Sequence, residues 1–370
     1  MDTSFSLGKT IRNNDLYESQ FKKGKMTPNI LVTGGAGFIG SHVVRALLNQ
    51  REFADYRITV LDNLSGGFRA NVPNHRRIDF IRGSITNEKL IKELFQKKRF
   101  AYVYHLAAYA AEGLSHFIRR FNYTNNLIGS MNLINAAVNY ESECFVFTSS
   151  IAVYGGGQVP MSEDMVPQPE DPYGIAKYAV ELDLKVANEM FGLKYIIFRP
   201  HNVYGEYQNI SDRYRNVVGI FMNQILQGKP ATIFGDGKQK RAFSYIGDIA
   251  PVIVRAPLVS KAHNRIFNIG ADQPYTVNEL AHKVAEAMGV NPEVVHLPPR
   301  KEVSIAFSDH SACQEVFGPI PQTLLEEGLN RMVAWVKAVG SRKSKKFKNI
   351  EISQGLPEVW LSESVEDEQV

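Results

Sequence analysis

The sequence has only two cysteines, Cys144 and Cys313, among its 370 residues. They form no CxxC pair and no ladder of regular spacings, so the sequence predicts neither a disulfide framework nor a metal site. Glycine and proline, at 28 and 17 residues, are too few for a collagen-like or low-complexity chain. Two isolated thiols are typical of a protein from a reducing compartment, and we predict a cytoplasmic location.

Long apolar runs and a strong excess of one charge are also lacking. No hydrophobic stretch approaches the roughly 20 residues that cross a bilayer, and residues 1–27 lack the apolar core of a secretory signal. The 42 basic and 38 acidic residues leave a net charge of +4. A dedicated nucleic-acid binder carries a concentrated basic field. We therefore expect neither a membrane nor a nucleic acid as a partner.

What the sequence does contain is an alternation of short apolar runs with stretches of helical periodicity. The predicted strands are 29–32, 57–61, 101–106, 144–148 and 195–198, and the predicted helices between them are 38–49, 88–97, 123–138 and 173–190. Apolar runs without alternation are typical of parallel strands that are buried on both faces. The pattern predicts an α/β fold with a doubly wound parallel sheet of the Rossmann type.

The pattern changes after Pro200, where helices at 217–227 and 277–288 flank a turn at 234–237. This half predicts a smaller α+β C-terminal lobe that binds the substrate. We divide the chain into a polar extension (1–27), a Rossmann domain (28–203, to which 244–270 returns), the substrate lobe (204–243 and 271–340) and a charged tail (341–370). The tail is basic at 342–348 and acidic at 363–368, so we expect it to be solvated and partly disordered.

A glycine-rich turn, Thr33-Gly34-Gly35-Ala36-Gly37-Phe38-Ile39-Gly40, joins the first predicted strand to the first predicted helix. Glycines at these spacings permit a tight turn, a close approach of the backbone to a pyrophosphate, and close packing of helix on strand. The helix start then directs free N–H groups at the phosphates. Asp62 follows 22 residues after Gly40. Its carboxylate would accept the ribose hydroxyls and repel a 2′-phosphate, so the predicted cofactor is NAD rather than NADP.

A second motif places Tyr173 four residues before Lys177 at the start of a predicted helix, so both side chains share one face. A phenol has a pKa of about 10, and a neighbouring ammonium lowers it toward the range of a useful base. Ser150 lies 23 residues earlier, at the end of the strand 144–148. Its hydroxyl could bond the same substrate oxygen, and we predict that Ser150, Tyr173 and Lys177 are catalytic.

The sequence resembles the extended short-chain dehydrogenase/reductase superfamily, and within it the NAD-dependent nucleotide-sugar epimerases and dehydratases. The resemblance rests on these two motifs and on the segments 62–65, 105–108, 148–155, 199–205 and 235–241. The resemblance covers 29–337. It implies that NAD contacts the following residues: Gly34, Gly37, Phe38, Ile39, Gly40, Asp62, Asn63, Ser84, Ile85, Leu106, Ala107, Ala108, Asn126, Tyr173 and Lys177. It also implies a homodimer that packs the helices at 123–138 and 173–190 into a four-helix bundle.

The residues after Ser150 indicate which reaction is catalysed. Where the sequence has Ile151-Ala152, the 4,6-dehydratases of this family carry Asp-Glu, the decarboxylases a Glu, and the GDP-mannose 3,5-epimerase a cysteine. An apolar pair cannot move protons at C5 or C6, so the sequence most resembles a UDP-sugar 4-epimerase. Such an enzyme oxidises C4 to a transient ketone and reduces it from the opposite face. Other nucleotide-sugar enzymes (dehydratase, decarboxylase, ketoreductase) and a non-catalytic NAD-binding scaffold are the alternatives.

By the same resemblance, Asn202, Arg241 and Arg300 contact the diphosphate of a UDP-sugar and Glu302 contacts the ribose of its nucleoside. Glu112 and Ser115 are expected to face the sugar. The position that limits the size of the sugar pocket aligns with Ala306, which favours acceptance of N-acetylhexosamines. Departures from the family pattern are Ser84 in place of an aspartate, Ala242 in place of an acid, Ala110 in place of a lysine, and an Arg300 one residue closer to Glu302.

Overall fold

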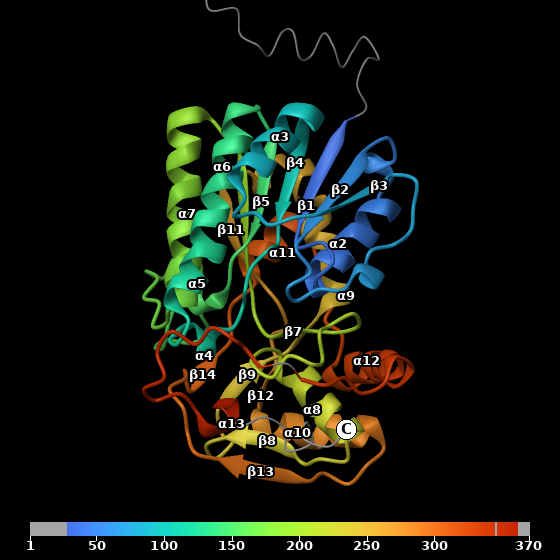
Figure 1. Cartoon of the computed structure of the whole chain (residues 1–370), viewed down its shortest axis with the longest axis vertical. Coiled ribbons are helices and arrows are strands. Elements are labelled where there is room, and N and C mark those ends of the chain that lie inside the picture. The colour runs from blue at the N-terminus through green and yellow to red at the C-terminus, as the bar shows by residue number, and fades with distance from the viewer. Residues whose placement is uncertain (1–27, 345, 362–370) are drawn as a thin grey trace, which may run out of the picture.

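The computed structural model describes residues 28–344 and 346–361, and its centre is a sheet of seven parallel strands (Figure 1). The strand order is β11-β6-β5-β4-β1-β2-β3. The strands are β1 (Asn29–Thr33), β2 (Arg57–Asp62), β3 (Ile78–Arg82), β4 (Phe100–His105), β5 (Cys144–Thr148), β6 (Tyr195–Pro200) and β11 (Arg265–Ile269). The order reverses between β1 and β4, which is where doubly wound sheets bind their ligands. The predicted Rossmann-type sheet is confirmed.

Helices cover both faces of this sheet because successive strand residues point to opposite sides. In β1, Ile30 and Val32 pack in one core cluster and Leu31 packs in the other. The helices over the first face are α2 (Phe38–Asn49), α9 (Ile246–Arg255) and α11 (Ser311–Phe317); those over the second are α3 (Glu88–Lys98), α6 (Gly129–Asn139) and α7 (Pro172–Phe191). Burial on both faces explains why the strand sequences lack alternation.

The smaller α+β lobe lies beyond the carboxyl ends of these strands, and its presence is also confirmed. Its short strands are β7 (Val203–Tyr204), β8 (Ala231–Phe234), β9 (Lys240–Ala242), β10 (Ser244–Tyr245), β12 (Pro274–Thr276), β13 (Val294–Leu297) and β14 (Ile305–Ala306). Its helices are α8 (Val217–Leu226), α10 (Val277–Met288) and α12 (Leu325–Val339). Sequence reasoning missed β3, an edge strand whose residues are only partly buried, and did not predict α12.

After α12 most residues of 346–360 are exposed, as expected for a solvated tail, but the chain is anchored to the protein at a few apolar positions. The side chains of Leu356 and Trp360 are buried, and a short helix, α13 (Glu358–Leu361), closes the described chain. The acidic end at 363–368 and the extension 1–27 lie outside the described residues.

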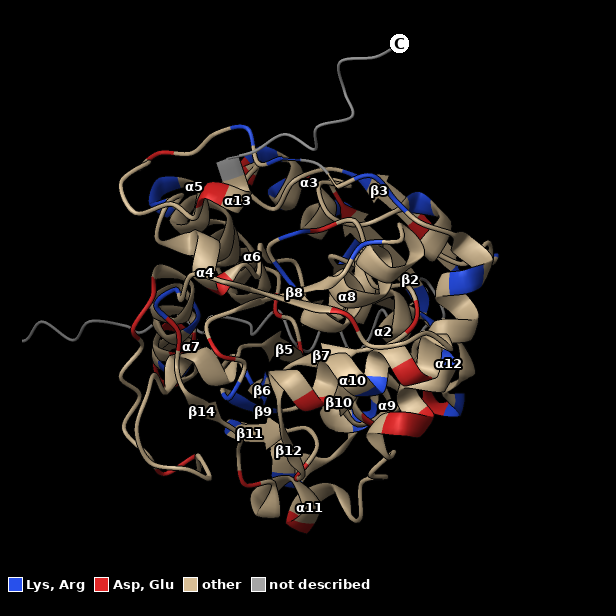
Figure 2. Ribbon diagram, turned by 90° about the horizontal axis from the view of Figure 1, so that it is seen from below, with Lys and Arg blue, Asp and Glu red and all other residues tan. Residues whose placement is uncertain are grey.

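Charged residues of both signs are spread around the outline of the molecule when it is viewed from the side of the substrate lobe (Figure 2). Within residues 28–344 and 346–361, no helix combines the length and hydropathy that a bilayer span requires.

Candidate active site

The glycine-rich turn between β1 and α2 is closed so tightly that side chains do not fit in it. Gly34 has a φ of +70°, and a Cβ added there would lie 2.8 Å from the backbone of Ala107. A Cβ on Gly40 would lie 2.1 Å from the carbonyl oxygen of Gly34. Gly37 is the N-cap of α2 and offers no side-chain acceptor to the first turn. The N–H groups of that turn are therefore available to an anion such as a pyrophosphate.

Asp62 ends β2 beside this turn. Its carboxylate accepts the N–H groups of Ala36 at 3.0 Å and Leu64 at 2.7 Å, which ties the turn to the neighbouring strand. Burial raises the pKa of Asp62, and these N–H groups oppose the rise. Each carboxylate oxygen can accept a further bond, so Asp62 is able to bind ribose hydroxyls at the cavity wall.

A cavity of about 200 Å³ lies over the turn. The predicted cofactor residues that line it are Gly34, Gly37, Phe38, Ile39, Gly40, Asp62, Asn63, Ser84, Ile85, Leu106, Ala107 and Ala108. The hydroxyl of Ser84 is shared with Thr86 at 2.8 Å. These residues fit a dinucleotide, with free N–H groups for the phosphates and a carboxylate for a ribose.

Asn126 does not line this cavity, and its contact with the cofactor stays a prediction. Its side-chain oxygen accepts the N–H of Tyr109 at 2.8 Å, and its amide donates to the Tyr109 carbonyl at 3.1 Å. The side chain also donates to Asn122 and is buried. Asn126 therefore holds the loop that follows β4, and this loop in turn lines the cofactor cavity.

The three predicted catalytic side chains come together at the carboxyl end of β5. Asp171 caps α7 by accepting the N–H of Gly174 at 2.9 Å, which places Tyr173 and Lys177 on successive turns. The Ser150 side chain lies near enough to the Tyr173 phenol to lower its pKa, and its hydroxyl accepts the N–H of Ala152 at 3.1 Å. The Nζ of Lys177 donates to the carbonyl of Thr148 at 2.7 Å and lies 5.8 Å from the centre of the Tyr173 ring.

The charges around Tyr173 differ from those that the motif suggested. Burial raises the pKa of the phenol above its ordinary value, and the Ser150 side chain opposes this most strongly. Among the surrounding charges, Glu112 raises this pKa and Arg215 lowers it. Burial also lowers the pKa of Lys177 to about 7. A positive charge that lowers the pKa of Tyr173 therefore comes from Arg215, a residue outside the motif.

Sequence reasoning missed Arg215, which lies in the loop between β7 and α8. Its Nε donates to Asp212 at 2.7 Å, and its guanidinium lies 4.6 Å from the centre of the Tyr109 ring. Arg215 lines both the cofactor cavity and the larger cavity beside it. The stretch 205–215 is polar and has no helical or strand period, so only the folded chain identifies this arginine.

A buried ion pair that the sequence argument also missed lies beneath Lys177. Glu181 follows Lys177 by one turn of α7 and binds Arg199 of β6 through two contacts of 3.0 and 2.5 Å. The hydroxyl of Ser149 donates to the same carboxylate at 2.5 Å. Both charged side chains are 2% exposed, and Glu181 opposes the fall in the pKa of Lys177. Continuing the four-residue spacing from Tyr173 and Lys177 would have pointed to Glu181.

The larger cavity, of about 1050 Å³, opens between the sheet and the small lobe. It is lined by most of the residues assigned to catalysis or substrate, namely Glu112, Tyr173, Lys177, Asn202, Arg241, Arg300, Glu302 and Ala306. Enclosure raises the pKa of Glu112, an effect that Asp171 increases and the two arginines reduce. Ser115 does not line either cavity. Its buried hydroxyl donates to the Glu112 carbonyl at 2.6 Å, so the expectation that it faces the sugar is wrong.

The two predicted diphosphate arginines flank one carboxylate. Glu302 lies 3.7 Å from the Nη2 of Arg241 and 3.5 Å from the Nη2 of Arg300. Arg241 also donates to the carbonyl of Ser304 at 3.2 Å, which fixes its guanidinium against the strand. The buried Nε of Arg300 has no hydrogen-bond partner among the described residues. This part of the cavity therefore presents two cations and one unused donor, which suits a diphosphate.

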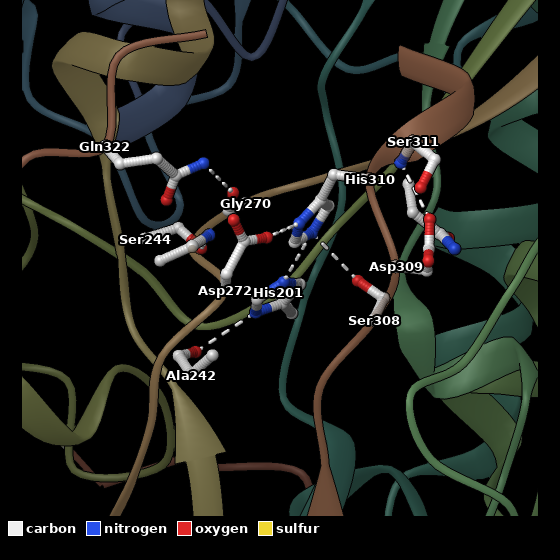
Figure 3. A network of polar contacts seen from close by, with 12 residues as sticks. His201, Ala242, Ser244, Gly270, Asp272, Ser308, Asp309, His310, Ser311 and Gln322 are labelled. Atoms are coloured by element: carbon white, nitrogen blue, oxygen red, sulfur yellow. Dashed lines mark hydrogen bonds and ion pairs between the residues drawn. The ribbon is translucent and has the colours of Figure 1, made fainter. Parts of the chain in front are cut away.

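His201, which precedes Asn202, belongs to a network of polar contacts that also includes His310 (Figure 3). The Nε2 atoms of His201 and His310 are 3.1 Å apart, and His310 Nδ1 lies 2.6 Å from Asp272. Burial and His310 lower the pKa of His201 to about 3, so this imidazole is neutral. The network joins the three loops that carry His201, Asp272 and His310 to strand β9, and it is structural.

The NAD dependent epimerase/dehydratase family model matches residues 30–270, which is more than half of the chain. This match includes the glycine-rich turn, Asp62 and the three side chains around Tyr173. The chain belongs to the NAD dependent epimerase/dehydratase family. It is therefore an enzyme of the extended short-chain dehydrogenase/reductase superfamily that uses NAD, for which the cavity over the turn is suited.

Two relatives of this family member are UDP-sugar epimerases of known structure. The UDP-glucose 4-epimerase of Thermotoga maritima, solved with UDP-glucose, is 38% identical, with a TM-score of 0.77, over 84% of this chain and 99% of the other. The UDP-N-acetylglucosamine 4-epimerase of Methanobrevibacter ruminantium, solved with UDP-N-acetylmuramic acid, is 31% identical with a TM-score of 0.78 over 85% and 99%. A putative UDP-glucose 4-epimerase of Methanocaldococcus jannaschii is 34% identical over 83% of this chain and 98% of its own.

Proposed function

We propose that this family member is an NAD-dependent epimerase that inverts C4 of a UDP-sugar. The observation that carries the proposal is that Ser150, Tyr173 and Lys177 are assembled beside the apolar pair Ile151-Ala152, which lines the same cavity. A dehydratase needs an acid and a base at that pair to eliminate water, and isoleucine and alanine supply neither. The similarity to UDP-sugar 4-epimerases supports the same conclusion.

The residues of the chain divide the reaction between them. When NAD is bound, it supplies the hydride acceptor and a positive ring charge. Tyr173 takes the proton of the C4 hydroxyl as this carbon is oxidised to a ketone, and returns it when the carbonyl is reduced. Ser150, which lies beside Tyr173, orients the same substrate oxygen through its hydroxyl. Arg241 and Arg300 hold the diphosphate while the sugar turns its opposite face toward the cofactor.

The test is a reaction of the purified protein with UDP-glucose, UDP-galactose and their N-acetylated counterparts, without added NAD. We expect each accepted sugar to approach an equilibrium mixture of C4 epimers, resolved by chromatography, with no net oxidation. A 4-keto-6-deoxy product would instead identify a dehydratase. A failure to convert any UDP-sugar, in protein that holds NAD, would contradict the proposed reaction and favour a binding role.

Ala306 controls the size of the accepted sugar in this proposal. It lies opposite Arg241 in the β9–β14 pair, lines the large cavity and is nearly buried. We expect Ala306→Tyr to reduce kcat/KM for UDP-N-acetylglucosamine about 10-fold or more relative to UDP-glucose, because the ring fills the space for the acetyl group. Parallel steady-state assays with both sugars measure this ratio. An unchanged ratio would show that another residue limits the pocket.

We further propose a homodimer formed through α7. Its exposed face carries Leu182, Val186 and Met190, which are 48, 53 and 69% exposed and lie one turn apart. A stripe of this kind on a 20-residue helix is typical of a subunit contact. We expect the double substitution Leu182→Glu/Val186→Glu to convert a dimer into monomers in light-scattering measurements. Leu258→Glu, at an exposed leucine elsewhere, is the control and should leave the mass unchanged.

A cytoplasmic location is part of the proposal. Cys144 and Cys313 are free, buried thiols, and burial raises the pKa of each to about 12. Such thiols are inert, and unpaired cysteines are usual in a reducing compartment.

A further inference from the structure

The C-terminal strap, residues 346–360, crosses from the small lobe to the Rossmann domain and back to α13 (Figure 1). The Phe347 ring packs between Tyr109 and Phe121, at 5.4 and 5.0 Å between ring centres. Both of these rings line the cofactor cavity. The N–H of Phe347 donates to the Tyr214 hydroxyl at 2.9 Å. The first part of the strap therefore joins the wall of the cofactor cavity to the loop that also carries Arg215.

The middle of the strap is attached to backbone groups of the Rossmann domain through the side chain and the N–H of Glu351. The Glu351 carboxylate accepts the N–H groups of Arg120 at 2.7 Å and Phe121 at 2.8 Å, at the start of α5 (Arg119–Tyr123). The N–H of Glu351 donates to the carbonyl of Phe117 at 2.8 Å. These bonds set the register of the strap, so the residues that follow reach the large cavity at a defined place.

Trp360 ends the strap inside an aromatic cluster drawn from three separate segments. Its ring lies 6.2 Å from Phe117, 5.4 Å from Tyr214 and 6.0 Å from Phe234, measured between ring centres. The side chain is only 3% exposed, yet it lines the large cavity. The first two neighbours belong to the α4–α5 and β7–α8 connections, and the third ends β8. Trp360 thus occupies the point where the two domains and the cavity meet.

The guanidinium of Arg300 lies over two of these rings. Its Cζ is 4.5 Å from the centre of the Phe234 ring and 5.7 Å from that of Trp360. One edge of the guanidinium pairs with Glu302 at 3.5 Å, while the buried Nε has no partner among the described residues. A cation packed on aromatic faces, with one donor unused, is held ready for an anion.

We propose that Trp360 is a positioning residue for the nucleoside diphosphate half of the substrate. Its ring holds the Arg300 guanidinium in place and closes the cavity wall next to it, so its removal would loosen the arginine and admit water. The inference rests on the proposed function only through the assignment of Arg300 to a diphosphate. The match to the Thermotoga maritima structure covers 84% of this chain, so about a sixth of the chain lies outside that match.

The test measures UDP binding by calorimetry to NAD-loaded wild-type protein and to Trp360→Ala and Trp360→Phe variants. We expect Trp360→Ala to weaken UDP binding about 10-fold or more, and Trp360→Phe, which keeps an aromatic face, to stay within about 3-fold. In turnover assays the alanine variant should show a raised KM for the UDP-sugar with a nearly unchanged kcat. Bound NAD and the melting temperature report whether each variant is folded.

Fluorescence provides a second readout, in which the Trp360 ring itself reports the binding of UDP. The chain has two tryptophans, and Trp335 lines neither cavity. In a Trp335→Phe variant we expect UDP to change the emission of Trp360 with the same Kd as calorimetry. In Trp360→Phe the remaining emission should not respond. Unaltered UDP affinity in Trp360→Ala, or a silent Trp360, would overturn the proposal.

These outcomes separate this inference from the proposed function. If Trp360→Ala weakens UDP binding but the wild-type protein converts no UDP-sugar, the epimerase assignment fails and the role of Trp360 stands. If the protein epimerises UDP-sugars and Trp360→Ala has the wild-type KM, the role of Trp360 fails and the epimerase assignment stands.

Discussion

The Tyr173→Phe variant is expected to convert UDP-sugars about 1,000-fold more slowly than the wild-type protein, because it lacks the group that moves the C4 hydroxyl proton. Its ring would keep the packing of Tyr173, which is buried beside Ser150. The remote cofactor contacts at Asp62 and the glycine-rich turn are untouched. We therefore expect the amount of NAD released on denaturation to equal that of the wild-type protein.

The matched control is Tyr178→Phe, which removes a phenol hydroxyl from the same helix. Tyr178 is partly buried against the apolar cluster that contains Val153 and Tyr154, and it does not itself line the large cavity. We expect it to retain wild-type kcat and KM for the UDP-sugar. Full activity in Tyr173→Phe would show that another group transfers the proton, and the catalytic assignment would then be withdrawn.

The second large effect concerns stability. Glu181→Gln should lower the free energy of unfolding by about 3 kcal/mol, because it leaves the Arg199 charge buried without a counter-charge. The guanidinium is 2% exposed, so water cannot replace the lost carboxylate, and one of its Nη atoms already lacks a partner among the described residues. Urea denaturation at neutral pH, followed by circular dichroism, measures the change.

An exposed pair of the same chemistry is the control for this effect. Glu327 and Arg331 of α12 are 55 and 50% exposed in their side chains, so Glu327→Gln should cost no more than about 0.5 kcal/mol. Replacing both partners of the buried pair, as Glu181→Leu with Arg199→Met, should recover most of the loss because no charge is then left unpaired. Equal losses for the two single variants would contradict the reasoning from burial.

The features that could be predicted from the sequence are those that depend on neighbours along the chain. The turn from Gly34 to Gly40 and the four-residue spacing of Tyr173 and Lys177 each involve one local segment, whose geometry follows from backbone sterics and the helical repeat. The same holds for the buried strands, since a parallel sheet with helices on both faces requires continuous apolar runs. These elements were predicted within a few residues of where they lie.

The errors occur where a side chain has more than one possible partner. Ser115 was expected to face the sugar because its loop follows the fourth strand, but in the fold its hydroxyl donates to the backbone at Glu112. A buried polar atom must be bonded, and which partner it finds depends on loops that the sequence does not place. The same limit hid Arg215, because a polar loop carries no period that reveals which of its residues turns inward.

The sequence by itself therefore determined five of the seven strands of the sheet, the cofactor turn and the pairing of Tyr173 with Lys177, because these follow from short-range spacing and residue type. Only the tertiary structure decided that Glu181 pairs with Arg199 under Lys177 and that Trp360 closes the cavity against Arg300. Both contacts join segments that are separate in the chain. Their formation depends on how the domains pack, and packing is set by the summed burial of many side chains rather than by any local pattern.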